Sequence, residues 1–209
     1  MKYKKINNII IKLFKKELLL SDNSFIIDRI SKINNFDFQK YESLVRTNIL
    51  EFENNFIYIQ LFQKRVKPYF HKDKMIQLAE ALDYFLSQDF VHGDINRRNV
   101  LCTSSGYKIV DYEPDIFQRR NCYNTFVFTQ PYISQRDVEN FTLTSLTDKI
   151  GFCYFILRMC NMISSREIFQ LNESKVRNHE LLIGLPESDI NVMTNLEIVN
   201  FYINSLKLN

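Results

Sequence analysis

A short polar stretch from His92 to Asn99 holds the residues whose types and spacing could do chemistry. It contains an aspartate, Asp94, and ends on Asn99 five residues later; a second aspartate, Asp111, follows after a predicted strand, turn and strand. Phosphoryl transfer from ATP needs such a set, because one carboxylate orients the attacking hydroxyl while a carboxamide and a second carboxylate hold magnesium on the nucleotide phosphates. The spacing therefore predicts a phosphotransferase site on one loop and the strand pair that follows it.

The elements that must position this stretch are β-rich before it and helical around and after it. A β-branched run and alternating apolar residues predict strands, and apolar positions at helical spacing predict helices. The expected strands are 8–14, 41–53, 55–62, 100–102 and 107–110, and the expected helices are 25–33, 73–87, 147–160 and 195–206. The segment 111–138 is long, polar and without periodicity, which is more typical of a functional loop than of filler.

Composition limits the class of protein. The 209 residues suit one domain or two small lobes, and 45% hydrophobic residues are enough for a core. The net charge of +3 is small and its basic residues are scattered, so no nucleic-acid partner is expected. No apolar run approaches the roughly 20 residues of a transmembrane helix. Four cysteines without metal-ligand spacing indicate free thiols, and with no signal peptide recognised we expect a cytoplasmic protein.

One lysine in the first predicted strand is out of place. Ile10, Lys12 and Phe14 share a strand face because side chains alternate. Burying an unpaired ammonium group is costly, so Lys12 is expected either to face a carboxylate or phosphate or to lie on an edge strand in contact with solvent. The segment alone does not separate these two possibilities.

The arrangement resembles the protein-kinase-like superfamily, which includes eukaryotic-type protein kinases, aminoglycoside and choline kinases, and lipopolysaccharide-core kinases. The resemblance spans about residues 9–160 and is most specific from Val91 to Asp111. It implies an α+β, two-lobed protein-kinase-like fold, with a reduced β-rich N-lobe at 1–62 and a shortened, mainly helical C-lobe at 63–209. It also implies ATP and Mg2+ as cofactors, Asp94 as the catalytic aspartate, and Asn99 and Asp111 as the metal-binding residues.

The same resemblance implies the residues that bind the nucleotide. Lys12 resembles the strand lysine that grips the nucleotide phosphates, and Asp28 would replace the helix glutamate that pairs with it. Gln60 to Phe62 resembles the hinge that hydrogen-bonds adenine through its backbone. Asn96 occupies the position of the usual catalytic-loop lysine, and Arg98 could reach the transferred phosphate instead.

Two further matches point toward protein kinases. Asp148 resembles the buried aspartate that anchors the backbone of the catalytic loop, and Thr129 to Ser134 resembles the segment that receives the residue after the phosphoacceptor. Two departures stand beside them. No glycine-rich sequence precedes Lys12, so the hairpin that covers the phosphates is expected to be missing or replaced. Gly93 stands where many protein kinases carry arginine, so activity should not need loop phosphorylation.

The favoured hypothesis is a protein kinase that phosphorylates Ser, Thr or Tyr hydroxyls. One alternative is a kinase of a small molecule or a lipopolysaccharide-core sugar, favoured by His92-Gly93-Asp94 and by Glu113 after Asp111, with Arg119-Arg120 binding an anionic acceptor. The other alternative is a catalytically silent kinase-like regulatory module, motivated by the missing glycine loop. In either case a partner chain could complete or regulate the reduced N-lobe.

Overall fold

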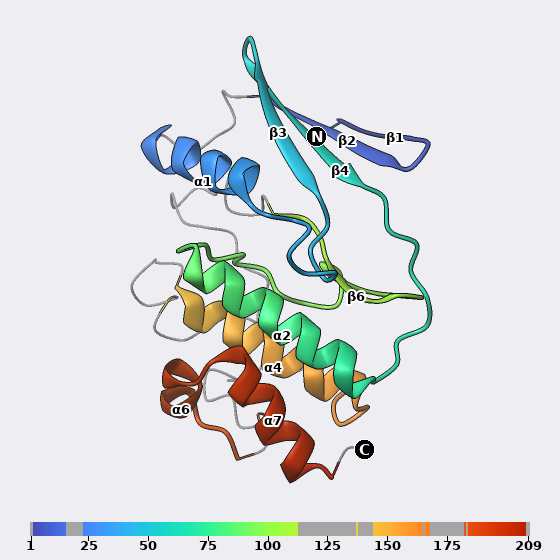
Figure 1. The fold of residues 1–209 in the computed structure, drawn as a ribbon, viewed down its shortest axis with the longest axis vertical. Helices are drawn as coiled ribbons and strands as arrows, with labels where there is room; N and C mark the ends of the chain where they lie inside the picture. Colours follow the sequence, from blue (N-terminus) through green and yellow to red (C-terminus); the bar gives the residue numbers. More distant parts are fainter. Residues whose placement is uncertain are drawn as a thin grey trace.

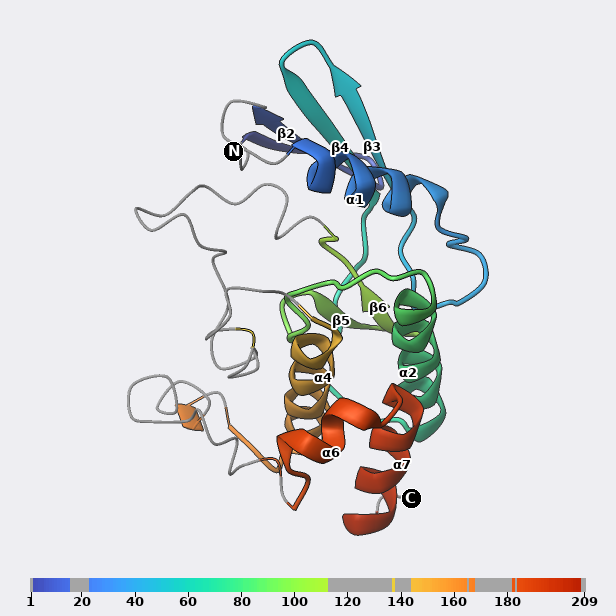
Figure 2. The ribbon, with the colours of Figure 1, turned by 90° about the vertical axis from the view of Figure 1, so that its left-hand side faces the viewer.

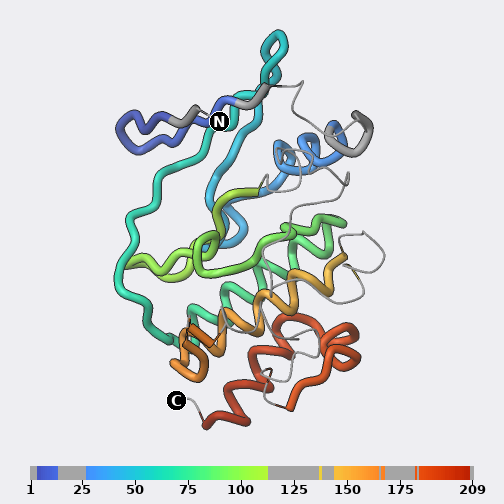
Figure 3. Tube along the Cα trace, turned by 180° about the vertical axis from the view of Figure 1, so that it is seen from behind, coloured from blue at the N-terminus to red at the C-terminus, as the bar shows by residue number. Residues whose placement is uncertain are grey.

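A small antiparallel sheet with one helix forms one end of the molecule, and a group of helices forms the other (Figures 1 and 2). The structure is a computed structural model that describes residues 2–15, 23–112, 137, 144–164, 166–167, 182 and 184–207. Within these residues the fold is α+β, as predicted, with five helices. The stretch 62–71 runs along one side of the molecule and links the two ends (Figure 3).

The sheet contains four strands in the order β1-β2-β4-β3, and every neighbouring pair is antiparallel. Its strands are β1 (Lys2–Ile6), β2 (Ile9–Lys15), β3 (Thr47–Phe52) and β4 (Asn55–Leu61). The predicted strands at 8–14 and 55–62 are thereby confirmed. The β2–β4 register pairs Ile10 with Gln60 and Lys12 with Tyr58.

The strand predicted at 41–53 starts too early, because only Thr47–Phe52 is a strand of the sheet. Residues 41–46 instead form turns and one parallel bridge, between Leu44 and Ile109. The amide of Val45 donates to the hydroxyl of Tyr112 at 2.9 Å, and the amide of Ile109 donates to the carbonyl of Ser43 at 2.8 Å. Backbone groups of this segment are thus hydrogen-bonded to residues near the site, and its apolar residues pack there rather than in the sheet.

A short hairpin without glycine includes the strand that carries Lys12, where the sequence predicted the phosphate-covering hairpin to be missing or replaced. Strand β1 pairs with β2 from the Lys2–Leu13 pair to the Ile6–Ile9 pair, through a tight turn at Asn7 and Asn8. Asn7 has φ 52°, and asparagine tolerates this left-handed conformation, so the turn forms without glycine. The lysine-rich β1 has weak strand propensity and carried no pattern that predicts it.

Helix α1 (Asn23–Asn35) covers one side of the sheet end and contacts β3. The other end contains α2 (Lys72–Ser87), α4 (Ser145–Met159), α6 (Glu187–Val192) and α7 (Asn195–Ser205). All of the predicted helices are found, and α4 is buried almost all round. Helix α7 docks on α2 because Asp83 accepts hydrogen bonds from the amides of Asn195 and Leu196, at 2.8 and 3.1 Å. These bonds satisfy amides that have no partner inside α7.

Two short strands between the ends carry the residues of the predicted site. They are β5 (Val100–Thr103) and β6 (Gly106–Ile109), paired antiparallel and fully buried. The amide of Val110 continues the ladder by donating to the carbonyl of Asn99 at 2.8 Å. The predicted strand–turn–strand therefore brings Asn99 and Asp111, twelve residues apart, to the same end of one hairpin.

The remaining expectations concern membrane-spanning helices, the cysteines and the loop that follows Asp111. No helix in the described part of the chain combines the length and hydrophobicity that a bilayer crossing needs. Cys102, Cys153 and Cys160 are free thiols, as predicted. Most of the 111–138 loop lies outside the described residues, and so do Thr129 to Ser134, Glu113, Arg119-Arg120 and Cys122.

Candidate active site

The carboxylate of Asp94 is held by two carboxamides from its own loop. The side-chain amide of Asn96 donates to Oδ1 at 2.5 Å, and that of Asn99 donates to Oδ2 at 2.6 Å. Asn96 is itself fixed, because its Oδ1 accepts from the amide of Arg98 at 2.8 Å and its side chain is buried. A carboxylate held in this way has a fixed orientation, which is what a group that accepts a proton from a hydroxyl requires.

Helix α4 supports this loop from below. The carboxylate of Asp148 accepts from the amides of His92 and Gly93, at 2.6 and 2.7 Å, so the predicted anchor is confirmed. One turn later, Gly151 lets the loop approach closely, since a Cβ added there would lie 2.3 Å from the carbonyl oxygen of Ile95. Gly93 has φ 87°, a conformation that an arginine would adopt only with strain, which explains why glycine stands at this position.

His92 is a structural histidine of the loop. Its Nε2 lies 3.0 Å from the carbonyl of Val110, and its Nδ1 lies 3.3 Å from the amide of Asp94. These partners assign the neutral ring with the proton on Nε2, because Nδ1 must accept. Burial lowers the pKa of His92 to about 4 and the nearby Arg29 guanidinium acts in the same direction, against the Val110 contact. The ring is therefore neutral at pH 7 and connects the loop to the residue that follows β6.

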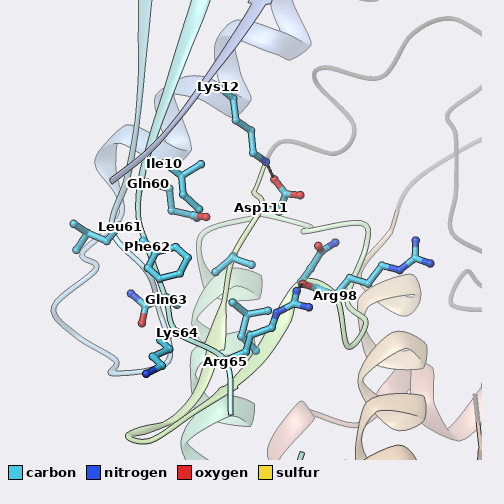
Figure 4. Close-up of a pocket in the computed structure, with 13 residues that line it drawn as sticks. Ile10, Lys12, Gln60, Leu61, Phe62, Gln63, Lys64, Arg65, Arg98 and Asp111 are labelled. Atoms are coloured by element: carbon cyan, nitrogen blue, oxygen red, sulfur yellow. Dashed lines mark hydrogen bonds and ion pairs between the residues drawn. The ribbon is translucent and has the colours of Figure 1, made fainter. Parts of the chain in front are cut away.

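Asp111 lies at the end of the hairpin and faces Lys12 across the gap between the sheet and the loop (Figure 4). The two side chains form an ion pair, so the expectation that Lys12 faces a carboxylate or phosphate is confirmed. Lys12 Nζ also lies 5.0 Å from the centroid of the Tyr58 ring. Asp111 has φ 67°, a left-handed conformation that is uncommon for a residue with a side chain and is concentrated at functional sites.

Asn99 and Asp111 fit a magnesium ion but would not bind it alone. The amide nitrogen of Asn99 is used on Asp94, which leaves its Oδ1 as the atom that can ligate a cation beside the carboxylate of Asp111. The described residues contain no group of three or more His, Cys, Asp or Glu side chains suited to a metal. Magnesium is usually bound by one or two carboxylates plus substrate phosphates, so this donor set suits a metal that arrives with a nucleotide.

A cavity of about 430 Å³ opens between the sheet and the loop (Figure 4). Its lining combines apolar side chains, which suit an aromatic ring, with cationic side chains and the two candidate metal ligands. The lining residues are Ile10, Lys12, Gln60, Leu61, Phe62, Gln63, Lys64, Arg65, Arg98, Asn99, Leu101, Val110 and Asp111. The cavity thus brings Lys12, Gln60, Phe62, Arg98, Asn99 and Asp111 of the predicted site around one space.

The hinge prediction is met only in part. The side chains of Gln60 and Phe62 line the cavity, but Gln60 Nε2 donates to Thr47 Oγ1 at 2.8 Å. The amide of Phe62 donates to the carbonyl of Asn8 at 2.7 Å, and the ammonium of Lys5 lies 3.2 Å from the centroid of the Phe62 ring. The Phe62 amide is therefore engaged by the β1–β2 turn rather than presented to a ligand.

The predicted Lys12–Asp28 pair is not formed. Asp28 forms its ion pair with Lys32, one turn along α1 at 3.0 Å, and its side chain is 59% exposed. Successive residues on a helix point about 100° apart, so only one of Asp28 and Arg29 can face the site. In this structure that residue is Arg29.

Arg29 is a site residue that the sequence analysis missed. Its guanidinium is buried and donates to the carbonyls of Val91, His92 and Tyr112, at 2.5, 3.1 and 2.9 Å. It also lies 4.2 Å from the centroid of the Phe90 ring. One side chain therefore connects α1 to both segments that carry the site, the one with Asp94 and the one with Asp111. The only signal in the sequence was an arginine among the isoleucines of a predicted amphipathic helix.

Comparisons with known proteins do not assign this site. No model of a known protein family matches the chain, and no curated protein matches it.

Proposed function

We propose that the chain is an ATP- and Mg2+-dependent phosphotransferase of the two-lobed, protein-kinase-like type, acting on a hydroxyl group. The single observation that carries the proposal is the convergence of Lys12, Asn99 and Asp111 on one cavity, beside the clamped carboxylate of Asp94. Phosphoryl transfer needs little covalent chemistry from the protein, so positioning and charge are what a site must supply. The sheet end and the helical end take the places of the N-lobe and C-lobe, 1–62 and 63–209.

Each side chain has one task in this proposal. Lys12 neutralises phosphate charge, and Asn99 and Asp111 would hold the metal, which would shield the charge that develops on the phosphates. Ile10, Leu101 and Val110 offer apolar surface to the base. Asp94 orients the acceptor hydroxyl and receives its proton. Lys12 already neutralises Asp111 in the structure, so the nucleotide with its metal would exchange partners with an existing ion pair.

The proposed acceptor is a Ser, Thr or Tyr hydroxyl of a protein, because the segment Thr129 to Ser134 resembles the substrate platform of protein kinases. A phosphorylated or acidic small molecule, such as a sugar, is the second candidate. The observation that favours it is the cationic character of the cavity, where Lys12, Lys64, Arg65 and Arg98 accompany one carboxylate.

The variant Asp94→Asn tests the assignment. Purified protein is incubated with labelled ATP and Mg2+ and with mixed protein and sugar acceptors, and the products are identified by mass spectrometry. We expect transfer to fall by about 10²–10⁴-fold, the usual contribution of a positioned base, while Mg2+-dependent ATP binding by calorimetry stays within about twofold.

The matched control is Asp89→Asn, since Asp89 is an exposed aspartate whose left-handed backbone asparagine also tolerates. The control should transfer as fast as the unaltered protein. Transfer by Asp94→Asn at the unaltered rate would contradict the catalytic assignment. ATP binding without turnover by any variant would identify a silent kinase-like module instead.

A further inference from the structure

The rim of the cavity carries more positive charge than the nucleotide site accounts for. Lys64 and Arg65 follow β4 directly, and Arg98 precedes Asn99 on the loop. All three side chains line the cavity and are exposed, and none forms an ion pair with a carboxylate in the described part of the chain. Figure 4 shows Lys12 and Asp111 at one end of the cavity, and Lys64 and Arg65 at the other.

The exposed side chain of Arg65 is held in place by a hydrogen bond. Its Nη2 donates to the carbonyl of Arg98 at 2.6 Å, which ties the segment after β4 to the loop that carries Asp94 and Asn99. This bond uses one of the five guanidinium N–H groups, and the others remain for a ligand. The backbone of Arg98 is fixed as well, because its amide donates to Asn96 Oδ1 at 2.8 Å. The Arg65 guanidinium is thus held beside the backbone from which the Arg98 side chain extends.

From this geometry we infer that Arg65 and Arg98 form an anion-binding subsite for the phosphoryl acceptor, which carries a phosphate or carboxylate group near its reactive hydroxyl. This inference rests on the proposed function and adds the substrate class to it. A guanidinium matches both oxyanions through two parallel hydrogen bonds, so the site selects the charge and planar geometry rather than one particular compound.

The position favours the acceptor over the nucleotide. The triphosphate and its metal would meet the Lys12–Asp111 pair, which Figure 4 shows at the opposite end of the cavity from Lys64, whereas the Arg65 guanidinium is bonded to the carbonyl of Arg98. The acceptor hydroxyl must reach Asp94, which lies on the same loop as Arg98. An anionic group on the acceptor would therefore meet the two arginines while its hydroxyl approaches the catalytic carboxylate.

The test uses the full chain, with inorganic phosphate and glutarate as probes. Each probe is titrated by calorimetry in the presence and absence of saturating AMP-PNP and Mg2+. We expect millimolar binding of at least one probe alongside the nucleotide analogue, and at least a tenfold loss of that affinity in Arg65→Ala. Arg65→Lys should lose less, and Lys67→Ala should lose nothing, because Lys67 is an exposed cation of the same segment outside the cavity.

The outcomes separate this inference from the proposed function. Phosphate binding without glutarate binding indicates a phosphorylated acceptor, and the reverse indicates a carboxylate; both support the subsite. Equal weakening of AMP-PNP and probe in Arg65→Ala would assign the arginine to the nucleotide and overturn the inference. Failure of the unaltered protein to bind AMP-PNP contradicts the proposed function. The titrations without nucleotide still test whether Arg65 and Arg98 bind an anion. Arg65→Gln, if folded by its melting temperature, replaces Arg65→Ala should that variant not fold.

Discussion

At the scale of single residues, the site is defined by what restrains Asp94. The side-chain amides of Asn96 and Asn99 each donate to one of its oxygens, and Nδ1 of His92 accepts a hydrogen bond from its backbone amide. The types and spacing of Asp94, Asn99 and Asp111 were enough to predict a shared site, because a short loop and a tight hairpin leave few arrangements for residues so close in sequence. The role of Asn96 could not be predicted, since it depends on the direction of one buried side chain.

The burial of His92 predicts a pH dependence of stability. Its pKa is about 4 in the folded protein and about 6.5 in the unfolded chain, so the unfolded chain binds the extra proton between these values. The contribution is present above pH 6.5 and is lost as the pH falls toward 4. The difference corresponds to about 3 kcal/mol in the free energy of unfolding. Urea unfolding at pH 6.5, 5 and 4 should show this loss in the unaltered protein and a smaller one in His92→Gln.

His71 provides the matched control, because it is an exposed histidine outside the site. His71→Gln should lose as much stability on acidification as the unaltered protein. An identical pH dependence in His92→Gln and the unaltered protein would show that His92 does not carry the effect.

At the scale of elements, the loop of residues 92–99 is held from two sides. Helix α4 supplies Asp148 and Gly151 beneath it, and α1 supplies Arg29 above it. The burial of α4 could be predicted, because a helix that is hydrophobic all round must be buried. The anchoring role of Asp148 was implied by the resemblance to protein kinases. The role of Arg29 could not be predicted, since the carbonyls it bonds are 62 to 83 residues away in the sequence. The error at Asp28 follows from the same limit: helical phase relative to a distant loop is not encoded locally.

Gly151→Ala tests the grip of α4. The new methyl group would meet the carbonyl oxygen of Ile95 at 2.3 Å, and backbone atoms on both sides cannot move aside cheaply. Although alanine favours helices over glycine by about 1 kcal/mol, we expect net destabilisation of about 1–3 kcal/mol from overpacking. Displacement of Ile95 should also move Asp94, so phosphoryl transfer should fall at temperatures where the protein is still folded. Chemical denaturation measures the first effect and labelled ATP the second.

Gly184→Ala is the comparison for this variant, because no heavy atom lies within 4 Å of a Cβ added at Gly184. Its φ of 73° makes alanine strained there, so it should also cost stability. It should leave transfer per folded molecule unchanged, because a Cβ added there would touch neither the loop nor a residue that holds it. Full activity in Gly151→Ala would show that the close approach of α4 and Ile95 does not position Asp94.

At the scale of the whole molecule, the cavity joins two parts that are otherwise linked by few elements. Its walls come from β2, β4 and residues 62–65 on one side, and from the loop and the β5–β6 hairpin on the other. Direct contacts between the ends include the Lys12–Asp111 pair and the three bonds of Arg29. The general α+β architecture could be predicted from strand and helix patterns. The hairpin turn at Asn7 could not, because it depends on a left-handed asparagine in a polar stretch.

A ligand that fills this cavity should stabilise both ends together. Saturation at 100 times its dissociation constant would add about 2.7 kcal/mol to the free energy of unfolding. We therefore expect AMP-PNP with Mg2+ to raise the midpoint of a single calorimetric transition. Asp111→Asn should remove most of the shift, because it takes away the only carboxylate in the described cavity lining. Asp37→Asn, at an exposed aspartate away from the cavity, should keep it. Two transitions of which AMP-PNP moves only one would mean that the nucleotide is bound by one end alone, and equal shifts in both variants would remove Asp111 from the binding site.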